Sequence, residues 1–324
     1  MKIAILGAGA VGLGLAATLD RGGCPPRIVV RNSKTRAALE SEGIHRHGLF
    51  GVAHVPPGQI ELVSHIRELA VPPVEILLVC TKAFDTPGVA EAVTAAWPAG
   101  SPRPRIVFCQ NGWGNERPFE ERWPSHHLFH ARVITGFRLD SPTRVEITAH
   151  AQPLAVGSLF GDATTELRPL VECLSRGGLP SEISEDIDAD LWAKMLYNCA
   201  LNPLGALLGV SYGELSERHE SRNILEAVVR EIFGVLQATG HRTHWTNASD
   251  YLDTFYRELL PPTRRHRSSM LQDLRALRPT EIDALCGEVV KLGQQHGVTT
   301  PVNEALRTLI TAREKRGAAA HPRP

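Results

Sequence analysis

The pattern of hydrophobic and polar residues changes at about residue 165. Before this point, short apolar runs alternate with amphipathic stretches, which is typical of strands joined by helices. After it, apolar residues recur every three to four positions, which predicts a series of helices. We therefore expect an α/β first domain followed by an all-helical second domain.

The strands expected in the first half are short apolar runs. They cover residues 3–6, 27–30, 75–81, 105–109, 127–134, 145–149 and 154–156. We expect the last three runs to close the same sheet, with the final two antiparallel. Residues 44–63, which contain a Pro-Pro-Gly turn and an alternating stretch, predict a hairpin-like excursion in place of a helix.

The helices expected in the second half are bounded by start and stop signals. They cover residues 165–176, 187–208, 221–239, 247–259, 280–296 and 304–314. Ser221 and Thr280 stand in N-cap positions, and Gly240 and Gly297 stand where helices should stop. The predicted helices therefore have local reasons to begin and end where they do.

The change of pattern places the domain boundary near residues 162–167. The first domain would span residues 1–165 and the second residues 166–316. Residues 317–324 offer small residues, His and Pro without apolar periodicity, so we expect a disordered tail there.

The helix expected at 187–208 carries a polar stripe. Lys194, Asn198 and Asn202 are spaced four residues apart, so they share one face of the helix. The rest of the stretch from Leu191 to Leu204 is mostly apolar, so this face must either pair inside the protein or line a wet cleft. An ammonium group and two amides suit a small polar substrate, as proton donor and oxygen ligands. A polar seam that only satisfies a neighbouring helix is the alternative.

A glycine-rich turn directly follows the first strand. Its sequence is Gly7-Ala8-Gly9-Ala10-Val11-Gly12, a G-x-G-x-x-G pattern that opens an amphipathic segment. Gly7 permits the tight turn, Gly9 lets a pyrophosphate approach the backbone, and Gly12 allows the helix to pack closely on the strand. This context predicts a Rossmann dinucleotide-binding domain. A tight turn without a ligand is the alternative.

The second strand runs into Arg31-Asn32-Ser33-Lys34. An NAD-binding fold usually carries an acidic residue at this point, about 20 residues after the glycines, and this segment has none. Arg31 offers a forked cation, Ser33 a hydroxyl and Lys34 a second charge, which together suit a 2′-phosphate. We therefore expect NADPH in preference to NADH. A solvated basic turn is the alternative.

Two further strands carry polar residues at their carboxyl ends, where open α/β sheets bind ligands. Lys82 follows one strand and Asn111 the other, and the glycine after Asn111 would let the turn aim its amide into the crevice. We expect the catalytic cleft between the two domains. His45 and His47 lie on one side of an extended segment, but with no acidic or cysteine partner nearby in the sequence we expect no metal site.

Charge and cysteine content narrow the function classes. The 324-residue chain has 35 Lys and Arg against 35 Asp and Glu, which argues against nucleic-acid and membrane partners. The basic cluster at 264–275 is short and lacks interleaved aromatic residues. Six scattered cysteines without a C-x-x-C pair predict buried free thiols. Without a signal peptide or membrane span in the pattern, we expect a cytoplasmic protein acting on a small molecule. Its oligomeric state stays open, with a homodimer as one candidate.

Several blocks spread over nearly the whole chain carry a family resemblance. They are Gly7–Gly12, Thr81-Lys82-Ala83, Gln110-Asn111-Gly112, Trp192-Ala193-Lys194 with Asn198 and Asn202-Pro203-Leu204, Ser268-Ser269-Met270-Leu271-Gln272-Asp273, and Thr280-Glu281-Ile282-Asp283. The glycine turn is shared by many Rossmann families, whereas the Lys-Asn-Asn helix and the Ser-Ser-Met segment are specific. In combination, these blocks resemble the ketopantoate reductases (2-dehydropantoate 2-reductases).

The resemblance implies a Rossmann domain followed by a helical domain, and reduction of the 2-oxo acid 2-dehydropantoate to (R)-pantoate with NADPH in pantothenate synthesis. By matched position, it implies Lys194 as the proton donor. The implied substrate contacts are Asn111, Asn198, Asn202 and Ser269. The implied coenzyme contacts, besides the glycine turn, are Arg31, Lys82, Asn111, Glu281 and Phe137 through its backbone. From the residues alone, Glu281 would be a helix-capping acid. No metal is needed.

Two departures from the family pattern bear on the substrate. Tyr212-Gly213-Glu214-Leu215 stands where the family commonly has Asn-Gly-Glu-Leu, and residues 150–157 lack the extra glycines usually found there. Tyr212 either lines the pocket or packs the end of the long helix with its hydroxyl at the surface. One alternative function is therefore reduction of another branched 2-oxo acid. The other is NADPH binding without turnover, which Lys194 disfavours because a buried unpaired lysine is costly.

Overall fold

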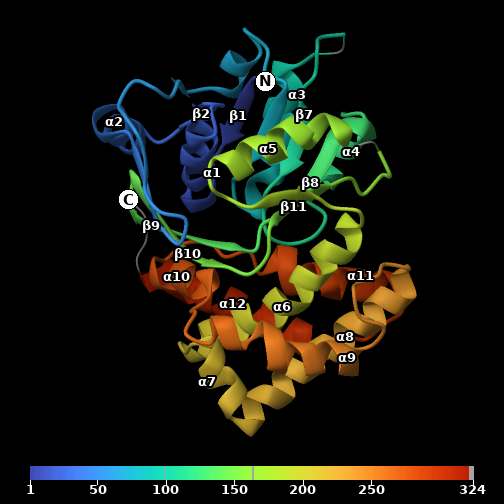
Figure 1. The fold of residues 1–324 in the computed structure, drawn as a ribbon. Helices are drawn as coiled ribbons and strands as arrows, with labels where there is room; N and C mark the ends of the chain where they lie inside the picture. The colour runs from blue at the N-terminus through green and yellow to red at the C-terminus, as the bar shows by residue number, and fades with distance from the viewer. Residues whose placement is uncertain (99, 163, 321–324) are drawn as a thin grey trace. The chain divides into compact units, whose positions relative to one another are not determined.

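The structure is a computed structural model that describes residues 1–98, 100–162 and 164–320 (Figure 1). The chain forms two compact units. The first unit comprises residues 1–110 and 115–187, and the second comprises residues 111–114 and the chain from residue 188 onwards.

An eight-stranded sheet forms the centre of the first unit, in the order β12-β11-β8-β7-β6-β1-β2-β5. Its strands are β1 (Ile3–Leu6), β2 (Arg27–Val29), β5 (Leu62–Val63), β6 (Ile76–Val79), β7 (Arg105–Phe108), β8 (Leu128–Arg132), β11 (Leu154–Gly157) and β12 (Ser181–Ile183). Neighbours are parallel except β8 and β11, which are antiparallel. The chain goes from β1 to β2 on one side and returns to β6 on the other. The carboxyl ends of β1 and β6 therefore form a topological switch point.

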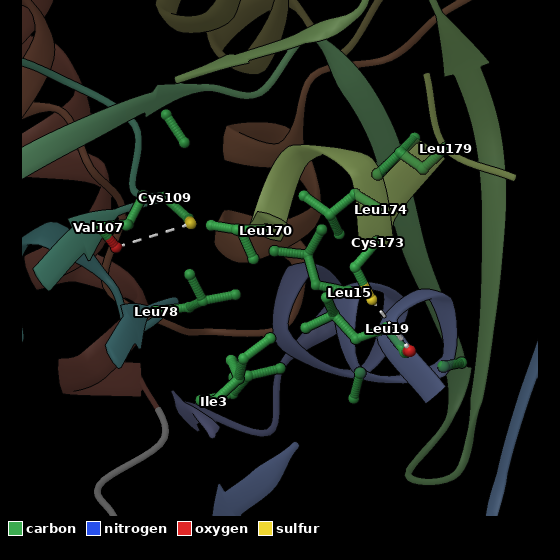
Figure 2. Close-up of a cluster of buried hydrophobic side chains, with 14 of the residues drawn as sticks. Ile3, Leu15, Leu19, Leu78, Val107, Cys109, Leu170, Cys173, Leu174 and Leu179 are labelled. Carbon is green, nitrogen blue, oxygen red and sulfur yellow. Dashed lines mark hydrogen bonds between the residues drawn. The ribbon is translucent and has the colours of Figure 1, made fainter. Parts of the chain in front are cut away.

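The central strands are buried on both faces. Ile3 and Ile5 of β1 belong to one hydrophobic cluster, whereas Ala4 and Leu6 belong to another. Figure 2 shows the first cluster, in which sheet residues meet side chains of α1 (Ala10–Arg21) and α5 (Arg168–Arg176). The second cluster includes residues of α3 (Thr86–Ala96). This double burial explains why the strands appear in the sequence as continuous apolar runs.

A second sheet of four strands packs against α1, in the order β4-β3-β10-β9. Its strands are β3 (Ile44–Gly48), β4 (Ala53–Val55), β9 (Thr135–Ser141) and β10 (Arg144–His150). The prediction that residues 145–149 join the main sheet is therefore wrong: β10 pairs with β3 in parallel and with β9 antiparallel. Every residue of α1 from Gly12 to Leu19 is buried. The second sheet covers the face of α1 that the first sheet leaves open.

The remaining elements of the first unit are short helices and turns. The helices are α2 (Ser33–Glu42) and α4 (Arg117–Glu120), and the 3₁₀ turns are Ile66–Leu69, Ala83–Asp85, Ser125–His127 and Thr165–Leu167. The helix expected at 165–176 is thus a 3₁₀ turn followed by α5. Because α5 packs on α1 and β12 pairs with β11, the change of unit comes at residue 188, later than the boundary expected at 165/166.

The second unit is helical. Its elements are α6 (Ile187–Leu208), α7 (Tyr212–Glu217), α8 (His219–Thr239), α9 (Ala248–Thr254), a π-helical turn (Phe255–Leu259), a 3₁₀ turn (Pro261–Thr263), α10 (Ser269–Arg275), a second π-helical turn (Asp283–Gly287), α11 (Glu288–His296) and α12 (Pro301–Ala320). The bounds predicted for α6 are confirmed. Gly240 and Gly297 end their helices in the left-handed conformation, with φ of 76° and 71°.

Two predicted N-caps are wrong. The helix α8 begins at His219, and the Ser221 hydroxyl, already inside it, donates to the Arg218 carbonyl oxygen at 3.1 Å. The Thr280 hydroxyl accepts from the Ile282 N–H at 3.3 Å, but the helical turn starts only at residue 283. In both cases the hydroxyl makes a local hydrogen bond to the backbone, as Ser and Thr often do, but the helix begins at another residue.

The end of the chain is only partly described. The helix α12 continues to Ala320 and so includes the first residues of the expected tail, whereas residues 321–324 lie outside the described chain. Within the described residues, no helix is long and apolar enough to span a membrane.

Candidate active site

The glycine turn of the first unit has the geometry that its sequence predicts. Gly7 has a φ of 109°, and a Cβ there would lie 2.9 Å from the Cys80 carbonyl carbon. A Cβ on Gly12 would lie 1.9 Å from the Gly7 oxygen, so only glycine lets the helix approach the strand. At Gly9, nothing lies within 4 Å of the added Cβ. The turn therefore leaves open space at the position where a pyrophosphate would approach.

The N-terminus of α1 is also suited to an anion. Gly9 is the N-cap, and within the described chain no side chain caps this end of the 12-residue helix. The first turn of a helix presents backbone N–H groups without intrahelical partners, and the helix dipole favours negative charge there. Ala10 and Val11 lie in this first turn, next to Ala8 in the glycine turn.

The basic segment after β2 is exposed. The Arg31 side chain is 74% exposed, and its Nη2 lies 4.0 Å from Asp85 Oδ2. Asn32 caps α2 by accepting from the Thr35 N–H at 2.9 Å, so Ser33 is the first helical residue. Asp85 lies 54 positions away from Arg31 along the chain, so no local pattern relates the two. An exposed pair at this distance is weak, about 0–1 kcal/mol, so a stronger anion can displace it.

A buried glutamine holds the segment at the carboxyl end of β6. Gln110 is 6% exposed, and its Nε2 donates to the Thr86 hydroxyl at 2.8 Å and to the Lys82 carbonyl oxygen at 3.3 Å. Its Oε1 has no hydrogen-bond partner among the described residues. Sequence reasoning singled out Lys82 but not the glutamine that positions its backbone. The sequence feature that could have pointed to Gln110 is its position just after β7 and directly before Asn111.

Phe137, predicted to contact the coenzyme through its backbone, lies on β9 and pairs with Ile147 of β10. Its ring packs on α1 at Gly14, where an added Cβ would lie 2.4 Å from the Phe137 Cδ1. Gly14 thus lets the second sheet approach the helix that follows the glycine turn. Phe137 thus packs on the helix that the glycine turn opens.

In the second unit, α6 carries the predicted polar stripe. Lys194 and Asn198 are partly buried, and Asn202 is 5% exposed. Asn202 Oδ1 accepts a hydrogen bond of 2.6 Å from the Tyr212 hydroxyl. Pro203, inside the helix, cannot donate to the Cys199 carbonyl, and the Cys286 thiol, 3.9 Å from that oxygen, donates to it instead.

Asn111 and Glu281 are brought together although they are 170 positions apart. Asn111 Nδ2 donates to Glu281 Oε2 at 3.0 Å, and Glu281 is 8% exposed. The short segment that contains Asn111 is anchored at Trp113, whose N–H donates to the Ala284 carbonyl at 3.0 Å and whose ring packs on Trp192 at 4.8 Å. Glu281 is therefore not simply a capping acid: it orients the amide of another predicted site residue.

The two serines before α10 have different roles. Ser268 is fully buried, caps the helix by accepting from the Leu271 N–H at 3.1 Å, and donates to the Asn202 backbone oxygen at 3.3 Å. Ser269, the first residue of α10, is exposed. Its hydroxyl is the one of the pair that a small ligand can reach.

The Tyr212 hydroxyl is buried, which rules out the alternative that places it at the surface. The residue is 4% exposed, and burial raises the pKa of its hydroxyl well above the usual value of 10.0. The basic cluster before α10 is tied to the region around α7: Arg264 pairs with Glu217 at 2.8 Å, and Arg267 lies 3.9 Å from Glu214. Two arginines of this cluster therefore pair with acidic side chains of α7.

The histidines considered for a metal site have other partners. His45 stacks on His54 with ring centroids 4.2 Å apart, and His47 Nε2 lies 2.8 Å from Asp140 Oδ2. This acidic partner is remote in the chain, so the local sequence around His47 does not reveal it. Within the described residues, no group of three or more His, Cys, Asp or Glu side chains could hold a metal ion. All six cysteines are free thiols, and Cys109, Cys173, Cys199 and Cys286 are buried.

Comparisons with known proteins agree with this arrangement. The family model described as "Ketopantoate reductase PanE/ApbA" matches residues 3–160, and "Ketopantoate reductase PanE/ApbA C terminal" matches residues 186–314. A 2-dehydropantoate 2-reductase of Aquifex aeolicus (strain VF5) is 33% identical over 316 residues, which cover 97% of each chain. One of Pyrobaculum aerophilum is 28% identical and covers 96% of this chain and 97% of the relative.

Solved structures show the same fold. A PanE/ApbA family ketopantoate reductase from Ralstonia eutropha JMP134 has a TM-score of 0.83 at 25% identity, covering 98% of this chain and 99% of the other. A D-mandelate dehydrogenase in complex with NADH and anilino(oxo)acetate has a TM-score of 0.84 at 21% identity with the same coverage, and it shows the fold alone. Because the two family models together cover most of the chain, this protein belongs to the ketopantoate reductase family.

Proposed function

We propose that this protein reduces 2-dehydropantoate to (R)-pantoate with NADPH and that Lys194 donates the proton. The observation that carries the proposal is the polar stripe of α6, a single 22-residue helix that holds Lys194, Asn198 and Asn202 at four-residue spacing. Family membership and near-full-length relatives named 2-dehydropantoate 2-reductase support the substrate.

The chemistry matches these groups. Reduction of a 2-oxo acid adds a hydride to the ketone carbon and a proton to the ketone oxygen, and bound NADPH would supply the hydride. The Lys194 ammonium group would stabilise the negative charge that develops on this oxygen and deliver the proton. The amides of Asn111, Asn198 and Asn202 and the hydroxyl of Ser269 would hold the substrate's oxygen atoms.

The first unit fits a dinucleotide on its own geometry. The open space at Gly9 and the uncapped start of α1 suit the pyrophosphate, with Gly7, Ala8, Ala10, Val11 and Gly12 completing the turn. We assign further coenzyme contacts to Lys82, to the Phe137 backbone, and in the second unit to Asn111 and Glu281.

We infer NADPH in preference to NADH from the segment after β2. It presents Arg31, Ser33 and Lys34 and no acid, and the carboxylate near Arg31, Asp85 at 4.0 Å, is itself exposed. A doubly charged 2′-phosphate attracts the guanidinium more strongly than one screened carboxylate does, and it can accept two parallel hydrogen bonds.

In this proposal, residues 1–165 supply most coenzyme contacts and residues 166–316 most substrate contacts, with Asn111 serving both. The reaction would belong to pantothenate biosynthesis in the cytoplasm. Assembly as a homodimer stays a prediction, to be measured by sedimentation.

The test is NADPH oxidation against a panel of 2-oxo acids. We expect kcat/KM for 2-dehydropantoate to exceed that for 2-oxoisovalerate and phenylglyoxylate by at least about tenfold, the discrimination that one or two extra groups in a pocket provide. A clear preference for another acid would instead indicate a different substrate within the family. Tight NADPH binding without turnover of any acid would contradict enzymatic function.

A further inference from the structure

The Tyr212 hydroxyl lies inside the second unit, next to the polar stripe of α6. It donates to Asn202 Oδ1 at 2.6 Å, a short distance for a hydrogen bond between a hydroxyl and an amide oxygen. Both residues are almost completely buried, at 4% and 5% exposure. Asn202, a member of the stripe, therefore has a side-chain partner on α7.

The tyrosine itself is held firmly. Its N–H donates to the His266 carbonyl at 3.0 Å, and the next N–H, of Gly213, donates to the Arg264 carbonyl at 2.8 Å. A Cβ on Gly213 would lie 2.9 Å from the Arg264 oxygen, so the backbones approach closely here. The Tyr212 ring contacts Tyr197 edge-on at 5.9 Å and the His266 ring at 5.1 Å. These contacts leave the hydroxyl little freedom to move away from Asn202.

This hydrogen bond decides which way the Asn202 amide faces. In the structure the single phenol hydrogen goes to Asn202 Oδ1. A flipped amide would instead donate to the phenol oxygen and take this acceptor away from the buried hydrogen, which is costly. Burial raises the pKa of Tyr212, so the hydroxyl keeps its proton at neutral pH. With Oδ1 turned toward Tyr212, the two Nδ2 hydrogens are on the other side of the amide.

The orientation matters for the proposed substrate. A 2-oxo acid presents a carboxylate and a ketone oxygen, which accept hydrogen bonds but cannot donate them. An amide whose N–H groups face these atoms binds them, whereas a flipped amide presents an oxygen to an oxygen. We propose that Tyr212 is a positioning residue that holds Asn202 as a hydrogen-bond donor for the oxygen atoms of the 2-oxo acid. This inference rests on the proposed function, in which Asn202 contacts the substrate.

The test is a double-mutant cycle on kcat/KM for the 2-oxo acid with saturating NADPH. Tyr212→Phe removes the hydroxyl and keeps the ring, and Asn202→Ala removes the amide. We expect Tyr212→Phe alone to lower kcat/KM by about 10- to 100-fold, the effect of losing one oriented hydrogen bond to a charged group. In the Asn202→Ala background, the same change should alter kcat/KM less than about twofold, because the group it orients is gone.

Tyr251→Phe is the matched control. Tyr251 is fully buried on α9, and its hydroxyl has no partner among the described residues, so its loss should leave kcat/KM unchanged. The KM for NADPH should stay the same in all variants. A Tyr212→Phe protein with a lower melting temperature but wild-type kcat/KM would show a purely structural role and overturn the inference. Tyr212→Phe that lowers kcat/KM equally in the wild-type and Asn202→Ala backgrounds would also overturn the inference.

The outcome also separates this inference from the proposed function. A wild-type protein that reduces no 2-oxo acid overturns both. A wild-type protein that reduces one, with Tyr212→Phe equally active, overturns the positioning role alone.

Discussion

At the scale of single residues, three buried or half-buried amides illustrate how the site is organised. Asn111 donates to Glu281, Asn202 accepts from Tyr212, and Gln110 donates to the Thr86 hydroxyl. An amide donates through its nitrogen and accepts through its oxygen. The partner that occupies one of these atoms therefore decides whether the other side of the amide offers a donor or an acceptor to a ligand. The residue type alone, without this partner, does not determine what the side chain recognises.

Lys194 provides the sharpest prediction at this scale. If Lys194 is the proton donor, as proposed, Lys194→Met, similar in length but without charge, should lower kcat by about two to four orders of magnitude, because the variant would lose both the acid and the charge that stabilises the oxyanion. Dissociation of NADPH, measured by fluorescence, should not change. Lys291→Met is a suitable control, since this lysine is half-exposed on α11 and pairs with Glu288 at 3.3 Å. If hydride transfer limits the rate and the variant keeps more than about a third of kcat, another group donates the proton.

Arg31 is expected to select the coenzyme. Arg31→Ala should raise the KM for NADPH by about 10- to 100-fold, as expected for a lost charge-assisted hydrogen bond of about 1.5–3 kcal/mol. The KM for NADH should stay nearly constant, because NADH lacks the 2′-phosphate. Arg67→Ala, at an exposed position of the same unit, controls for the general loss of a positive charge. Equal changes for both coenzymes would rule out a contact with the 2′-phosphate.

At the scale of elements, α1 connects the glycine turn to both sheets of the first unit. Its N-terminus follows the glycines, its residues from Gly12 to Leu19 are all buried, and Gly14 contacts the Phe137 ring of the second sheet. A helix enclosed on all sides cannot shift to relieve a clash at one end. The cost of an added Cβ at each glycine of the turn therefore depends on the space around that glycine.

Gly12→Ala and Gly9→Ala separate packing from binding. At Gly12 the new Cβ would lie 1.9 Å from the Gly7 oxygen, so we expect a loss of about 1–3 kcal/mol in the free energy of unfolding. At Gly9 nothing lies within 4 Å, so the ligand-free variant should keep its melting temperature while NADPH binds more weakly. Calorimetry with and without NADPH measures both effects. If the Gly9→Ala protein binds NADPH as well as the wild type does, the pyrophosphate does not bind at this position.

At the scale of the whole molecule, stability in acid depends on a buried pair that the sequence did not reveal. Glu116 Oε2 lies 2.9 Å from His130 Nε2, and both side chains are less than a tenth exposed. Burial alone would raise the pKa of Glu116, but the hydrogen bond and charge of His130 outweigh it and hold this pKa below the usual 4.5. Stability from this lowered pKa is present above pH 4.5 and is lost as the pH falls through the folded value.

Glu116→Gln tests this dependence. The variant cannot lose a charge at residue 116, so its free energy of unfolding should fall less than that of the wild type between pH 6 and pH 3, a range chosen to bracket about pH 4.5. Glu121→Gln, on an exposed carboxyl next to the same short helix, should leave the wild-type slope intact. Denaturation by urea at several pH values measures both. If the free energy of unfolding depends on pH equally in Glu116→Gln and in the wild type, Glu116 does not carry this acid dependence.

The sequence by itself determined the features that depend on local spacing. The strands β1, β2, β6 and β7 follow from short apolar runs, and the shared face of Lys194, Asn198 and Asn202 follows from the helical period of 3.6 residues. The glycine turn follows from glycine's freedom at positive φ, and the predicted bounds of α6 match the structure. These properties require only residues close together in the chain.

Tertiary structure alone decided the rest, because it joins residues that no local pattern relates. The pairing of β10 with β3, the change of unit at residue 188, and the partners Asp85 and Glu281 involve segments far apart in the sequence. Tyr212 is only ten positions from Asn202, but it lies on the next helix, and only the packing of the two helices brings the side chains together. An apolar run shows that a strand will be buried, but not which sheet it will join. Likewise, a polar side chain shows that a partner is needed, and only the folded chain selects that partner and the direction the group faces.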